Sequence, residues 1–201
     1  MTKIHVLCFD EPRPENCVII NTTSRSKGWS KGLSPFFLPG NKIYDGTIAG
    51  NVENAYQYSK VYSMHADENG DPTPVYFEWA KKGWLEKKAN RYPMGKNVKP
   101  LYLYWKDKKY GYLEGKEHIY IPLYARSVVD SDAFKKLKIV WQFCQNSDLD
   151  LVLLDFDAYD HRMRGLDWQD ILKQNNKKFG HAFVLAFLLL DLLDDKFKFK
   201  K

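Results

Sequence analysis

The chain has 201 residues and a mass of 23.6 kDa, of which 44% are hydrophobic and 28% charged, as is typical of one globular domain. Aromatic residues make up 15%, and this supply of buried surface excludes an intrinsically disordered chain. The formal net charge of +6 favours an anionic partner, such as a nucleotide, a nucleic acid or an acidic surface.

The first half of the sequence contains signals for two strands and two helices. Short strands are predicted over residues 4–9 and 17–21, because apolar and β-branched residues gather there. Residues 22–50 carry Ser, Lys, Gly and Pro, which favours a loop pressed against the body. Two helices are then predicted, one capped by Asn51 with apolar positions continuing to Met64, the other capped by Thr73 with Pro74 first and running to residue 89.

The second half is more helical, although residues 91–115 give no firm assignment. Together the elements predict an α+β fold, predominantly helical, with a few short strands in a single domain over residues 1–201. The elements predicted here are a helix over 117–129 that Pro122 kinks or delays, a helix capped by Ser131 and reaching Cys144, a buried strand over 149–156, a helix from Asp167 to Gln174, an all-apolar helix over 179–194, and a frayed basic tail over 196–201.

Several classes of site and compartment are not indicated by the sequence. No apolar run approaches the ~20 residues of a membrane span, and the start lacks a secretion signal, so we expect a cytoplasmic protein with no membrane association. Cys8, Cys17 and Cys144 are odd in number and widely spaced, which favours free thiols. The histidines lack ligand spacing, and the acidic run at 155–160 lacks the glycine and glutamate of a calcium loop, so we expect no metal and no cofactor.

Three groups of residues could carry chemistry. Glu53, Gln57 and Lys60 share one helical face, since spacings of four and seven align side chains; the alternative is an ordinary solvated stripe. The acids at 155–160 follow a buried strand, where a carboxylate sits at a cleft edge; the alternative is a set of turn-formers and a helix cap. Trp105 and other aromatics near Lys and Gly could stack on a base or pack in the core.

These motifs occur in an order that resembles the NADAR family, which includes small N-glycosidases acting on ribosylated pyrimidines and ADP-ribose-type compounds. Residues 33–37 are similar to the family's Ser-x-Phe-Ser-Asn-Phe-like loop, and residues 53–60 match its Glu-x-x-Tyr/Phe-Gln-x-x-Lys helix. The later motifs of the family are similar to Met94-Gly95-Lys96, Lys99-Pro100, Trp105, Phe156-Asp157-Ala158-Tyr159 and residues 177–182, so that the resemblance covers about residues 19–190.

The sequence also departs from the family pattern. The Trp-Gly that follows the acidic loop in the family is Asp160-His161 here, and the Ser-Asn-Phe is Ser34-Pro35-Phe36. The asparagine of the last loop would fall at Lys177. The resemblance therefore carries over the scaffold, whereas the substrate is left open and a loss of activity remains an alternative.

The resemblance implies a NADAR-like domain that hydrolyses the N-glycosidic bond of a ribosylated or ADP-ribosylated base or nucleotide derivative. This reaction passes through an oxocarbenium-like ribosyl cation, for which Glu53 and Asp157 would supply two carboxylates. The partner would be a small nucleotide-type substrate or ADP-ribosylated nucleic acid; the alternative is a non-catalytic module that sequesters an ADP-ribose-type nucleotide or binds nucleic acid. The residues expected to bind substrate are Ser34, Phe36, Tyr56, Lys60, Lys96, Trp105 and Tyr159.

Overall fold

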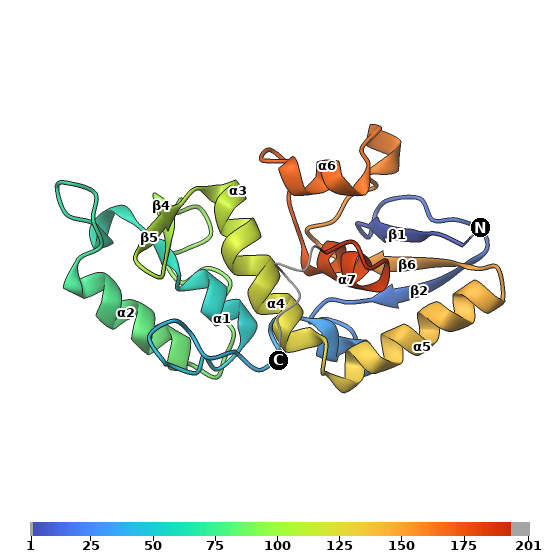
Figure 1. Ribbon diagram of the computed structural model, residues 1–201, viewed down its shortest axis with the longest axis horizontal. Helices are drawn as coiled ribbons and strands as arrows, with labels where there is room; N and C mark the ends of the chain where they lie inside the picture. The colour runs from blue at the N-terminus through green and yellow to red at the C-terminus, as the bar shows by residue number, and fades with distance from the viewer. Residues whose placement is uncertain (1, 194–201) are drawn as a thin grey trace. The chain divides into compact units, whose positions relative to one another are not determined.

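The computed structural model describes residues 2–193, and Figure 1 shows its helices and strands. Backbone contacts divide the chain into two compact units. The first unit contains the described residues up to Ser34 and from Tyr124 onward, and the second is Pro35–Leu123. The described residues contain more helix than strand, which confirms the predicted α+β class. The predicted tail at 196–201 lies outside the described residues.

A parallel three-stranded sheet forms the centre of the first unit. Its strands β1 (Ile4–Leu7), β6 (Asp150–Leu154) and β2 (Cys17–Asn21) lie in that order, with β6 in the middle. Residues 151–154 of β6 are all buried, because both faces of a parallel sheet are covered. The three strands predicted from the sequence are confirmed, with slightly shorter ends for β1 and β6.

Helices pack around this sheet. The two caps predicted for helices of this unit form, because the Ser131 hydroxyl accepts from the backbone of Phe134 and the Asp167 carboxylate accepts from the backbone of Asp170. The two helices α5 and α7 contact β6, and α7 is buried along most of its length. The helical segments of this unit are η1 (Trp29–Leu33), α5 (Asp132–Asn146), η4 (Arg162–Arg164), α6 (Trp168–Lys173) and α7 (His181–Leu189).

The second unit combines an antiparallel sheet with helices. Strands β3 (Lys60–Val61), β4 (Tyr102–Trp105) and β5 (Lys108–Tyr110) lie in chain order. The helical segments are α1 (Val52–Gln57), η2 (Ser63–His65), α2 (Pro74–Leu85), α3 (Tyr112–Gly115) and the π-helical η3 (Lys116–Tyr120). The next helix, α4 (Ile121–Val128), continues directly from η3 with helical backbone at Ile121, so the late start predicted at Pro122 is wrong. The boundary with the first unit lies within α4. None of the described helices is both long and apolar enough to cross a membrane.

Several predictions for the second unit are wrong or incomplete. The helix predicted to run to residue 89 ends at Leu85, and the hydroxyl of its predicted cap, Thr73, donates to the carbonyl of His65 instead. The helix predicted to continue to Met64 ends at Gln57, because Lys60 pairs with Leu103 and turns the chain into β3. The unassigned region at 91–115 contains the β4–β5 hairpin, whose two-residue turn, Lys106 and Asp107, has φ values of 50° and 60°. Asn-Gly is the usual sequence for such a turn, so Lys-Asp gives no signal.

Candidate functional site

The short helix α1 carries the predicted stripe and is anchored at its start. The Asn51 side chain accepts from the backbone of Asn54 at 2.8 Å. The Asn51 and Asn54 amides donate to the backbone carbonyls of Lys87 and Glu86, at 3.1 and 2.9 Å. These bonds fix a six-residue helix that would be marginal by itself.

A chain of hydrogen bonds runs along α1 into β3. Gln57 Nε2 donates to Glu53 Oε1 at 2.9 Å, and Lys60 Nζ donates to Gln57 Oε1 at 2.6 Å. Glu53 is 6% exposed and Gln57 is 8% exposed. The alternative of an ordinary solvated stripe is therefore wrong for these two residues. The Gln57 amide thereby holds the buried carboxyl group of Glu53 in a fixed position.

Tyr56 lies beside this chain. The Lys60 ammonium is 4.9 Å from the centroid of the Tyr56 ring, and the Tyr120 ring is also 4.9 Å from it. Burial, followed by nearby Tyr112 and Glu53, raises the pKa of Tyr56. Its phenol is consequently neutral over the working pH range and offers an aromatic face beside a cation.

Lys116 is a candidate that the sequence analysis missed. Tyr112, Lys116 and Tyr120 follow one another at intervals of four, so that they share one side of the α3–η3 stretch. The Tyr120 ring contacts that of Tyr56 at a centroid distance of 4.9 Å, so the end of this stretch lies beside α1. Lys116 is 2% exposed, and burial lowers its pKa to about 8. The tyrosine–lysine–tyrosine spacing, on a π-helical turn of a kind frequent at functional sites, is the signal that could have found it.

The loop before α1 brings another predicted residue close to Glu53. The backbone N–H of Glu53 donates to the carbonyl of Pro35 at 3.1 Å, and that of Val52 donates to Leu38 at 3.2 Å. Phe36 is part of this loop and is half-buried. Glu53, Tyr56 and Lys60 therefore follow one another along α1 into β3, and the loop that carries Phe36 is bonded to the start of α1.

Trp105 and Lys96 lie on other elements of the second unit. Trp105 is buried in β4, and its ring lies nearly perpendicular to that of Tyr44 at a centroid distance of 5.0 Å. This packing favours the core role that the sequence left open for Trp105. Lys96 is exposed in the segment between α2 and β4.

The first unit carries the remaining predicted residues. Asp157 is half-buried, with its carboxylate 3.6 Å from the Lys178 ammonium. Tyr159 is buried, and its ring is 5.1 Å from that of Phe183 and 5.4 Å from the Arg164 guanidinium. Ser34 is buried at the end of η1. Asp157 and Tyr159 thus share the loop after β6.

Asp155, directly after β6, has the most constrained carboxylate in this loop. Asp155 Oδ2 lies 3.0 Å from His181 Nδ1 and accepts from the backbone of Ala182 at 3.2 Å. Its other oxygen accepts from the backbone of Asp157 at 3.3 Å. Burial disfavours the charged form, but His181 and the two N–H groups outweigh burial and lower the pKa of Asp155 to about 2. Asp155 therefore organises the loop that carries Asp157.

Glu53 and Asp157 belong to different units, and their meeting at one sugar stays a prediction. Within residues 2–193, no group of three or more His, Cys, Asp or Glu side chains is arranged to hold a metal ion. Comparison with known proteins gives no match to a family model and no significant match to a curated protein.

Proposed function

We propose that the chain is an N-glycosidase of the NADAR type, which hydrolyses the bond between ribose and base in a ribosylated or ADP-ribosylated base or nucleotide derivative. The observation that carries the proposal is the buried Glu53–Gln57–Lys60 chain beside Tyr56. It unites a fixed carboxylate, an aromatic face and a cation. These are groups that a ribosyl cation and its attached phosphates require.

In the proposed reaction, the bond between C1′ and the base nitrogen breaks, and its electron pair leaves with the base. Glu53 stabilises the positive charge that develops at C1′, and Asp157 takes a proton from the water that attacks this carbon. The departing base takes up a proton, so that the products are free base and a ribose hydroxyl. The Tyr56 ring shields the ribosyl cation, and the Lys60 ammonium binds a phosphate group of the substrate.

The first experiment establishes turnover. Purified protein is incubated separately with an ADP-ribosylated oligonucleotide, an ADP-ribosyl nucleotide and NAD, and released base is measured by chromatography. We expect release of free base from at least one ribosylated substrate. No release from any of them, while binding is retained, would overturn the enzyme proposal.

One observation favours a second candidate, a non-catalytic module that binds a nucleotide or a nucleic acid. The segment between α2 and β4 carries a dense set of basic residues together with Tyr92, whose side chain is 44% exposed. Cations beside an exposed ring are typical of surfaces that bind single strands. The basic residues are Lys87, Lys88, Arg91, Lys96 and Lys99.

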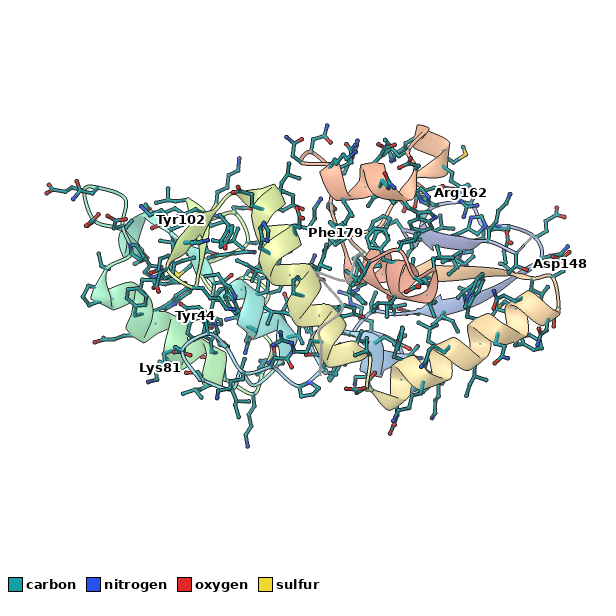
Figure 2. All side chains as sticks on the ribbon, in the orientation of Figure 1. Tyr44, Lys81, Tyr102, Asp148, Arg162 and Phe179 are labelled. Carbon is teal, nitrogen blue, oxygen red and sulfur yellow. The ribbon has the colours of Figure 1, made fainter. Side chains whose placement is uncertain are left out.

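Salt titration separates the two candidates. A polyanion binder loses affinity log-linearly with salt, with a slope of about −0.7 per neutralised phosphate on a single strand. If the basic segment binds the strand, Lys96→Ala should reduce the slope by roughly that amount. Lys81→Ala changes an exposed lysine on α2 (Figure 2) and serves as the matched control. Equal slopes for both variants and the unaltered chain would exclude this role for Lys96.

A further inference from the structure

A buried aspartate–histidine pair lies at the carboxyl ends of two neighbouring strands, β6 and β2. Asp155 follows β6 and His181 opens α7, and their side chains are 5% and 7% exposed. His181 Nδ1 lies 3.0 Å from Asp155 Oδ2, and Nε2 lies 2.8 Å from the carbonyl oxygen of Thr22, which follows β2. Both ring nitrogens therefore face an oxygen.

The partners fix the protonation of the ring. A backbone carbonyl can only accept, so Nε2 must carry a hydrogen. The Asp155 carboxylate accepts backbone N–H bonds from Ala182 and Asp157 on its two oxygens, which favours its ionised form, and Nδ1 then donates to it as well. A neutral imidazole carries only one N–H, and turning the ring over would aim carbon atoms at both acceptors.

We propose that His181 is held as an imidazolium and that, through the Asp155 carboxylate, this cation fixes the loop that carries Asp157. Asp157 is tied in directly, because its backbone N–H donates to Asp155 Oδ1 at 3.3 Å. The consequence for activity rests on the proposed function: His181 and Asp155 then act as positioning residues for the second carboxylate.

The surroundings of the pair agree with a permanent charge. Two titratable groups that face the imidazole are the Asp155 carboxylate and Tyr124, whose ring lies 5.5 Å from that of His181. Burial raises the pKa of Tyr124, so this phenol is neutral and does not compete for the proton. In the first turn of α7, the backbone N–H of Ala182 also donates to the Asp155 carboxylate.

The backbone at Gly180 also packs closely against the Asp155 carboxylate. A Cβ atom placed on Gly180 would lie only 2.1 Å from Asp155 Oδ2. Because residue 180 is glycine, the start of α7 can approach the Asp155 carboxylate closely. The end of β6 and the start of α7 are therefore in direct contact through this carboxylate. The carboxylate is thereby held between β6, the Asp157 loop and α7.

The charge state is tested by ¹H–¹⁵N NMR of the full chain labelled at the histidine ring nitrogens. At neutral pH we expect both nitrogens of His181 to carry a proton. The signals are assigned by their loss in His181→Gln or, if that variant does not fold, from contacts with the Tyr124 ring in the unaltered chain. A single protonated nitrogen at neutral pH would overturn the proposal.

Two matched variants test whether Asp155 and His181 fix the loop that carries Asp157. Asp155→Asn removes the charge, so we expect a neutral His181 ring at neutral pH and amide exchange of Asp157 accelerated on the order of tenfold or more. Asp150→Asn disrupts the other Asp–His pair of the sheet, in which His5 Nε2 lies 2.7 Å from Asp150 Oδ2, and should change neither readout.

Unchanged Asp157 exchange in Asp155→Asn, or an equal change in Asp150→Asn, would refute the positioning role. If Asp155→Asn does not fold, the ring spectrum of the unaltered chain still decides the charge state. Neither readout needs a substrate. A failure to release base would leave this inference standing, and a neutral His181 would leave the proposed hydrolysis standing.

Discussion

Replacement of Gly180 by alanine isolates one contact of the Asp155 site. The backbone at Gly180 has φ −96° and ψ 169°, which alanine adopts without strain, so the new methyl group is the only perturbation. That methyl carbon would lie 2.1 Å from Asp155 Oδ2, the atom that contacts His181 and accepts from Ala182. The carboxylate must therefore move and give up both bonds.

The expected change in the free energy of unfolding follows from these bonds. Hydrogen bonds to a charged group contribute about 1.5–3 kcal/mol each, and Gly→Ala at a compatible position returns about 0.4–1 kcal/mol. We therefore expect Gly180→Ala to lower the stability by about 2–5 kcal/mol. Urea unfolding, followed by tryptophan fluorescence, measures this difference.

Gly28→Ala provides the control. Gly28 belongs to the same unit, has a φ of −110°, and a Cβ there would meet nothing within 4 Å. It should therefore gain about 0.4–1 kcal/mol from the reduced freedom of the unfolded chain. A Gly180→Ala protein as stable as the Gly28→Ala protein would refute the close approach of α7 to Asp155.

Three further predictions concern the two units. Gly83→Ala should destabilise the chain although alanine favours a helix, because its Cβ would lie 1.9 Å from the Tyr58 ring; thermal melting measures the change. His161 is buried, and burial, with Arg162 next, lowers its pKa to about 4. Because the unfolded chain takes up this proton at higher pH, stability should fall as pH drops from about 6.5 to about 4, by roughly 3 kcal/mol from this group. In His161→Phe, the urea midpoint should depend less on pH over that range than it does in the unaltered chain. An equal pH dependence in both proteins would contradict the lowered pKa of His161. Asp157→Asn should slow base release on the order of 100-fold, whereas Asp130→Asn, an exposed change in the same unit, should not.

Local chemistry explains what the sequence predicted well. Ser131 and Asp167 cap their helices because a short polar side chain satisfies the first backbone N–H groups whatever the rest of the fold does. Pro74 begins α2 for a similar local reason, since its ring fits only the first turn of a helix. The apolar run of β6 likewise predicted a buried strand.

Non-local pairing explains what the sequence missed. The helix after Asn51 ends early because β4, more than 40 residues away along the chain, pairs with Lys60. The bond between Asp155 and His181 joins the end of a strand to the start of a helix, with no spacing rule to reveal it. The Glu53 stripe was predicted from helical spacing, but its burial depends on the tertiary fold and could not be read from that spacing.

The central claim is that the buried Glu53 carboxylate stabilises a ribosyl cation. The most direct measurement compares base release by the unaltered chain, by Glu53→Gln and by Glu78→Gln, which changes an exposed glutamate on α2. We predict that Glu53→Gln loses on the order of 100-fold or more of the rate with little change in melting temperature, while Glu78→Gln keeps it. A full rate in folded Glu53→Gln would contradict the account.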